Sequence, residues 1–260
     1  MVDFARLSRV ALEAMAACGR EVASCEAELR AAHSSVVVEA LQNAPAIAAW
    51  QHYPEGDVFD PSSHAQYFYH AHDAAERKGE SAEHGHFHAF LRARGMPPGM
   101  RPLVMPELAI ADNPAAPRAA PTPSAPQPAA GEEGDPWSHL AAIAIDAAGK
   151  PLRFFATNRW VTGETWYAAA DVAAMLDRFV LGPVPPSPLL NRWITAMIGL
   201  YKPLLAAMIA QRDAAVMEWR RRRRAKVHVL EDRRLEIVAT LAIDVADQIA
   251  RIEEALRRAA

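Results

Sequence analysis

The chain has 260 residues, of which 51% are hydrophobic, so it is long enough for one large domain or two small ones. Its net charge of -3 argues against a general binder of polyanions, because attraction to phosphate requires a positive field. Cys18 and Cys25 are the two cysteines. They lie seven residues apart in a predicted helix, about 10 Å along its axis and too far for a disulfide. Together with a first segment unlike a secretory signal, they predict a cytoplasmic protein.

The first 100 residues predict helices at the start and a mixture of elements after them. Apolar residues spaced by three and four predict an amphipathic helix over 4–29, and the run at 36–41 continues it or begins another element. Residues 50–61 predict an ordered loop, followed by a serine-capped helix that ends by residue 79. The period-two alternation of 84–93 favours a strand, with a helix from about residue 83 as the alternative.

The composition changes over 106–136, where eight of the twenty prolines lie. This stretch predicts a flexible linker that divides the chain into halves 1–105 and 137–260. Beyond it, 139–146 and 151–160 predict a β-hairpin. We expect three helices to follow, over 167–179, over 189–224 with a kink at Pro203, and over 235–256 with a narrow apolar seam. The apolar stretch 193–210 is expected to be a buried core helix, with no membrane association.

A dense group of histidines and carboxylates is the one feature that points to chemistry. Seven of the ten histidines and seven acids fall in one short window: His52, His64, His70, His72, His84, His86 and His88, with Glu55, Asp57, Asp60, Asp73, Glu76, Glu80 and Glu83. Imidazole is the commonest protein ligand for metals and titrates near neutral pH. The window predicts a metal or proton-transfer site, and histidines with purely structural roles are the alternative.

Alternate residues of a strand share one face, so the spacing of these histidines suits convergent ligands. We expect a divalent ion (iron, manganese or zinc) to be held by residues of this set: His70, His72, His84, His86 and His88. Glu83 or Asp57 would be a further ligand or a general base. Copper is less favoured, although Met96, Met100 and Met105 lie nearby and thioethers suit copper(I).

The segment TNRWVTGETW (157–166) follows a predicted strand and supplies two further candidate catalytic residues. Glu164 would complete a histidine–carboxylate shell, and Arg159 would clamp an anionic ligand with two hydrogen bonds. The alternative is an ion pair between Arg159 and Glu164. His139 would approach the histidines if its strand pairs with the segment at 84–93.

The run Arg220–Arg224 is the strongest concentration of like charge. Its place near a helix C-terminus, where cations complement the helix dipole, favours a structural role over nucleic-acid binding. The sequence therefore predicts an unidentified small molecule as a partner, and self-association through the C-terminal helix.

Several strings resemble a bacterial family of uncharacterised proteins, a domain of unknown function. The strings are HYPEGDVFD (52–60), QYFYHAH (66–72), EHGHFHAFLR (83–92), GMPPGMRP (95–102) and NRWVTGETWYAA (158–169). The resemblance covers most of the chain apart from the proline-rich segment, and it implies no particular activity.

We therefore expect an α+β protein in which a small antiparallel sheet is packed with N- and C-terminal helices and carries a proline-rich insertion. The two halves would form one composite domain. The leading functional hypothesis is a metal-binding protein, an enzyme of undetermined reaction. The alternatives are a non-enzymatic interaction module with structural histidines and a protein that traffics or senses copper.

Overall fold

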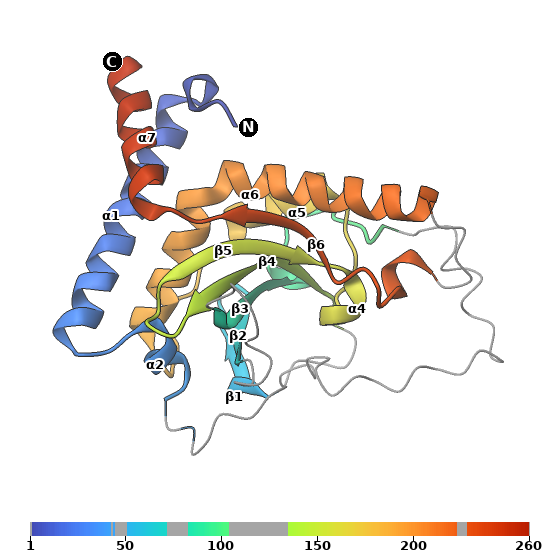
Figure 1. The fold of residues 1–260 in the computed structure, drawn as a ribbon, viewed down its shortest axis with the longest axis horizontal. Coiled ribbons are helices and arrows are strands. Elements are labelled where there is room, and N and C mark those ends of the chain that lie inside the picture. The colour runs from blue at the N-terminus through green and yellow to red at the C-terminus, as the bar shows by residue number, and fades with distance from the viewer. Residues whose placement is uncertain are drawn as a thin grey trace.

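A computed structural model gives the fold, and it describes residues 2–42, 44, 51–71, 83–103, 135–222 and 228–259. One sheet of six antiparallel strands follows the chain order from β1 to β6 (Figure 1). The strands are β1 (His52–Phe59), β2 (Ala65–Ala71), β3 (Glu83–Arg92), β4 (Trp137–Asp146), β5 (Pro151–Thr157) and β6 (Ile237–Ala242). The α-helices are α1 (Arg9–Ala31), α2 (Val36–Ala40), α4 (Arg159–Thr162), α5 (Ala169–Met175), α6 (Pro188–Arg222) and α7 (Val245–Arg258). Short 3-10 helices are η1 (Phe4–Arg6), η2 (Ala93–Gly95), η3 (Leu176–Arg178) and η4 (Val229–Glu231). The predicted α+β class is confirmed.

The long helix α6 organises the helical layer. It bends visibly part-way along its length, and Pro203 lies inside it, as the sequence predicts (Figure 1). Its buried side chains, among them Trp193 and Leu205, belong to the same core cluster as Phe87 and Phe154 of the sheet. Helices therefore cover one face of the sheet.

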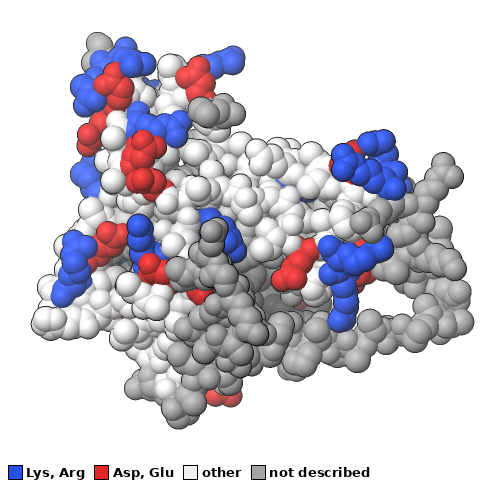
Figure 2. Space-filling view, viewed as in Figure 1, with Lys and Arg blue, Asp and Glu red and all other residues white. Residues whose placement is uncertain are grey.

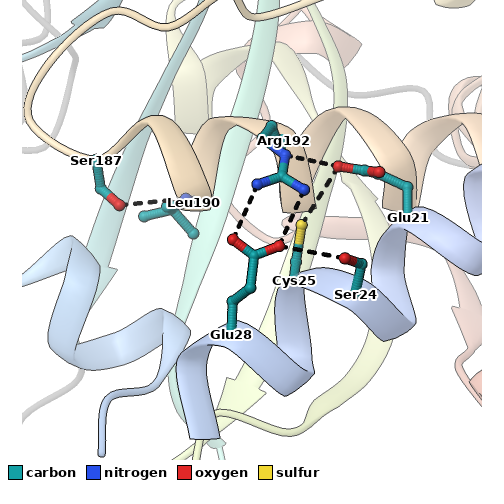
Figure 3. A network of polar contacts seen from close by, with 7 residues as sticks. All are labelled: Glu21, Ser24, Cys25, Glu28, Ser187, Leu190 and Arg192. Atoms are coloured by element: carbon teal, nitrogen blue, oxygen red, sulfur yellow. Dashed lines mark hydrogen bonds and ion pairs between the residues drawn. The ribbon is translucent and has the colours of Figure 1, made fainter. Parts of the chain in front are cut away.

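An arginine of α6 ties this layer to α1 (Figure 3). Arg192 donates through Nε to Oε1 of Glu21 at 2.6 Å, and through both terminal nitrogens to the carboxylate of Glu28 at 3.1 Å. The thiol of Cys25 donates to the same Glu21 oxygen at 3.7 Å. Cys18 and Cys25 are both free, in agreement with their spacing. Burial raises the pKa of Cys25 to about 11, so this thiol stays protonated.

Strand β3 and the β4–β5 hairpin form where the sequence predicts them. Strand β3 pairs with β4 along its whole length, so the strands before and after the proline-rich segment belong to one sheet. The division into domains stays a prediction. The predicted linker lies almost entirely outside the described residues.

Two predictions for the segment before β3 are wrong. The expected loop at 50–61 is strand β1, in which residues 54–57 form an excursion between Tyr53 and Val58, the paired positions. This excursion hides the period of the strand. The expected helix from residue 62 is strand β2, whose tyrosines face the helices while the side chains between them face away.

The predicted final helix is half right. Residues 237–242 form edge strand β6, and the helix begins after Asp244, whose side chain accepts from the backbone N–H of Asp247. Apolar residues before that cap belong to the sheet and to the cluster around Trp166. The apolar seam of α7 packs within the chain, since Ile252 is fully buried.

Helix α6 is the one helix of the described part that is long and apolar enough to cross a membrane by length and composition. Of its apolar stretch, 56% is buried within the protein. A core helix of a soluble protein meets the same criteria.

Candidate functional site

The second face of the sheet carries a row of imidazoles. On β3, Phe87, Ala89 and Leu91 point into the helical core, so the residues between them point to the opposite face. Ring contacts link the histidines across three strands. The ring centroids are 5.2 Å apart for His70 and His86, 4.6 Å for His86 and His88, and 5.0 Å for His88 and His139. We call these four residues the histidine row.

His88 and His139 approach each other through their ring nitrogens. Nδ1 of His88 lies 3.1 Å from Nε2 of His139, and Oγ1 of Thr157 lies 3.5 Å from the other ring nitrogen of His139. Burial lowers the pKa of His88 well below its usual value, and neighbouring imidazoles lower it further. Burial, with the positive charge of Arg212, lowers the pKa of His139 to about 3. Both rings are therefore neutral at pH 7, the state in which imidazole binds metals.

A carboxylate orients the third ring of the row. Nδ1 of His86 donates to Oε1 of Glu83 at 2.9 Å, and the other oxygen of Glu83 accepts from Arg153 at 2.7 Å. Glu83, expected as a ligand or base, therefore positions His86. A carboxylate bonded to one nitrogen of a histidine fixes the tautomer and raises the basicity of the other nitrogen.

Two irregularities of register decide which histidines belong to the row. His84 is an extra residue between Glu83 and Gly85 in the β3–β4 pairing, and its Nδ1 lies 2.7 Å from the hydroxyl of Tyr69, whose ring is in the helical core. The expectation that His84 shares a face with His86 and His88 is therefore wrong. Conversely, Leu140 is an extra residue of β4, and this bulge turns His139 to the face of the row.

Glu164 lies in the loop after α4 and accepts a backbone hydrogen bond from β4 that a neighbouring strand would otherwise accept. Its Oε2 accepts from the backbone N–H of His139 at 2.8 Å. Its Oε1 has no hydrogen-bond partner among the described residues, although the side chain is only 1% exposed. Burial raises the pKa of Glu164 to about 7, against the opposing charge of Arg212.

Asp57 belongs to a second polar chain on the same face. Its two oxygens accept from His52 Nδ1 at 3.1 Å and from the amide of Gln66 at 2.6 Å. The carbonyl of Gln66 in turn accepts from Nε of Arg92 at 2.7 Å. Asp57 thus holds Gln66 in one orientation and does not contact the histidine row in the described structure.

Arg159 pairs with Glu231 of η4, so the alternative of an ion pair between Arg159 and Glu164 is wrong. The charge of Arg159 still acts on Glu164, where it opposes the raising of the pKa by burial. His72 lies outside the described residues, as does Met105. Met96 and Met100 pack with the helical core, and the copper hypothesis stays a prediction.

Sequence reasoning missed the residues that surround the row. Arg92 and Gln66 carry no metal-ligating signal, and Arg212 comes from the distant α6, where its guanidinium lies 3.9 Å from the ring centroid of Trp166. The period-two position of Arg92, in step with His86 and His88, is the one signal that places it on this face.

Charged side chains gather at the ends of the molecule, one group near α7 and one near the end of α6 (Figure 2). At the end of α6, Arg221 and Arg222 both pair with Glu218, so much of their charge is compensated. The rest of the arginine run, from Arg223, lies outside the described residues.

Within the described part of the chain, no group of three or more histidine, cysteine or acidic side chains is already arranged to hold a metal ion. The row supplies the nitrogen pair of His88 and His139, with further imidazoles beside it.

Fold and site together define an α+β protein whose second sheet face carries a row of imidazoles, of which His88 and His139 are buried and neutral. The chain belongs to the family described as a domain of unknown function (DUF6969), whose model matches residues 16–243. The chain matches no curated protein and no solved structure.

Proposed function

We propose that the protein is a metal-binding enzyme whose centre is the histidine row. The observation that carries this proposal is the 3.1 Å separation of His88 Nδ1 and His139 Nε2. Two nitrogens bound to one ion at about 2.1 Å, with angles between 90° and 109°, lie about 3.0–3.4 Å apart. The same distance fits a hydrogen bond between neutral rings, so the experiment must separate the two.

The donor set favours iron(II), manganese(II) or zinc(II). Imidazole suits all three ions, and the uncharged state of His88 and His139 removes the competition from protons at neutral pH. His86, held by Glu83, and His70 are the neighbours that would extend the pair to a full set. A bound ion of this kind supplies Lewis acidity and a water of lowered pKa.

Glu164 is our candidate for proton transfer. Its Oε1 is buried and has no partner in the part of the chain that the structure describes, and its other oxygen is fixed by the backbone of His139, so the carboxyl is held in position beside the row. A positioned carboxyl in a desolvated site is a common general acid or base. Glu83 and Asp57 act by orienting His86 and Gln66, respectively.

Elemental analysis of protein purified without a histidine tag tests the proposal. We expect near-stoichiometric iron, manganese or zinc in the natural chain and loss of that metal in the double variant His88→Gln/His139→Gln. The matched control is His33→Asn/His64→Asn, because both residues lie outside the row and have positive φ, which asparagine tolerates. Metal-free natural protein that takes up no added ion would overturn the proposal, as would full metal content in the folded double variant.

The second hypothesis is that the protein is an interaction module that associates with a second copy through its C-terminal helix. The buried side of α7 already packs on α1, where Ile249 approaches Gly19. A partner would therefore have to use the outer, polar side of α7.

A further inference from the structure

We infer that Arg92 is a binding site for an oxyanion, a carboxylate or phosphate group, on the same face as the histidine row. Arg92 ends β3 opposite Trp137 of β4, and it is only 2% exposed. Its guanidinium carbon lies 5.6 Å from the ring centroids of both Phe59 and Trp137. Aromatic contacts of this kind hold the planar group in place while leaving its edge for hydrogen bonding.

The hydrogen-bond inventory of this arginine is incomplete. Nε donates to the carbonyl of Gln66 at 2.7 Å, and Nη1 lies 3.7 Å from Oδ2 of Asp135, beyond hydrogen-bonding distance. Nη2 is buried and has no acceptor among the described residues. A guanidinium buried in this way is expected to have acceptors for its N–H groups, because unpaired buried charge is costly.

The neighbouring groups keep the site receptive to a negative ligand. Asp57, the nearby carboxylate, is bonded to the amide nitrogen of Gln66, so Arg92 meets a neutral carbonyl in its place. Among the described residues, Asp135 is the one carboxylate that lies within 4 Å of the guanidinium of Arg92. At 3.7 Å this carboxylate makes no hydrogen bond to Nη1, so an oxyanion that accepts from Nη1 and Nη2 together would supply the acceptors that these two groups lack among the described residues.

The position of Arg92 relative to the histidine row limits the kind of substrate that could reach both, if the proposed function holds. Arg92 and Trp137 form one cross-strand pair, and Phe90 and His139 form the next on the same face. Pairs two residues apart on a strand are separated by about 7 Å. A substrate with its oxyanion at Arg92 would thus place an atom about 7 Å away beside His139.

Binding of inorganic phosphate and of acetate to metal-free, chelator-treated protein tests the oxyanion site, with chloride at equal ionic strength as the reference. We expect saturable binding by calorimetry to the natural chain and a loss of about tenfold or more in affinity for Arg92→Met. The control Arg101→Met removes an exposed arginine and should leave binding unchanged.

A second variant keeps the inference open to refutation if Arg92→Met fails to fold. Asp135→Asn removes the competing carboxylate and should tighten phosphate binding by about threefold or more. No saturable binding of either ion to the natural chain overturns the inference, as does unchanged affinity in Asp135→Asn together with folded Arg92→Met. Because metal is absent throughout, failure here leaves the metal proposal standing, and failure of the metal analysis leaves this result unaffected.

Discussion

Replacing Glu164 with glutamine should change how the stability of the metal-free protein depends on pH. The glutamine oxygen still accepts from the backbone N–H of His139, which Glu164 does at 2.8 Å. Its amide also supplies a donor at the position of the unpartnered Oε1, as a protonated carboxyl would. The substitution therefore removes the titration and little else.

The sign of the effect follows from the raised pKa of Glu164. Burial moves that pKa from 4.5 to about 7, so the folded protein binds a proton between these pH values that the unfolded chain releases. Stability from this group is present below pH 4.5 and is lost as pH rises through 7. A difference of about 2.5 pKa units corresponds to about 3 kcal/mol, the cost of ionising a carboxyl that is only 1% exposed.

Urea unfolding between pH 4.5 and 8 measures this cost as the difference between the variant and the natural chain. Glu164→Gln should gain about 3 kcal/mol relative to the natural protein across that range, nearly all of it above pH 5. The control Glu13→Gln, on the exposed side of α1, should give a curve parallel to that of the natural chain. Parallel curves for Glu164→Gln as well would show that this carboxyl titrates normally, and the reasoning about its burial would fail.

Three further predictions concern the row, the sheet and the C-terminal helix. The lowered pKa of His139 means that its contribution to stability disappears as pH falls from 6.5 to 4. In the Glu164→Gln background, His139→Gln should therefore lose less stability on acidification over this range, by about 1.4 kcal/mol per pH unit. Urea unfolding measures the difference. Gly85→Ala should lower the free energy of unfolding by about 3 kcal/mol in the same assay, because its Cβ would lie 2.3 Å from the carbonyl oxygen of His70. The control Gly99→Ala meets nothing within 4 Å and should cost about 1 kcal/mol for its positive φ. Equal costs would contradict the contact at Gly85. Ile252→Ala should lower the free energy of unfolding by about 2–4 kcal/mol without changing the mass measured by light scattering, and a change of oligomeric state with unaltered stability would instead favour a seam between chains.

Two signals in the sequence predict strands correctly. The segment at 84–93 alternates with a period of two, and the β4–β5 hairpin is marked by aromatic and β-branched residues on either side of a turn; the structure places both as strands. The same period runs through β2, where Gln66, Phe68 and His70 alternate with two core tyrosines. A serine pair that resembles a helix cap conceals it. The excursion at 54–57 likewise interrupts β1, so neither element could be derived from pattern alone.

The C-terminal error has a different physical cause. A strand followed directly by a helix can imitate one long helical stripe when its apolar residues fall at intervals of three and four. Val238 fits that stripe, yet it belongs to β6. The β-branched content of Ile237–Ala242 and the capping side chain of Asp244 mark the true boundary, and both are visible in the sequence.

Membership of the histidine row depends on bulges, which a count of spacings cannot supply. Without the bulge at Leu140, regular alternation would place His139 on the face of Ala141, in the helical core, and its ring would not meet His88. The extra residue at His84 acts in the opposite sense, because it directs that ring to Tyr69 and brings Glu83 onto the face of His86. The two bulges in the β3–β4 pair thus remove His84 from the row and add His139. They also bring in Glu83, the carboxylate that orients His86. A candidate site on an antiparallel sheet is therefore defined by register as much as by residue type.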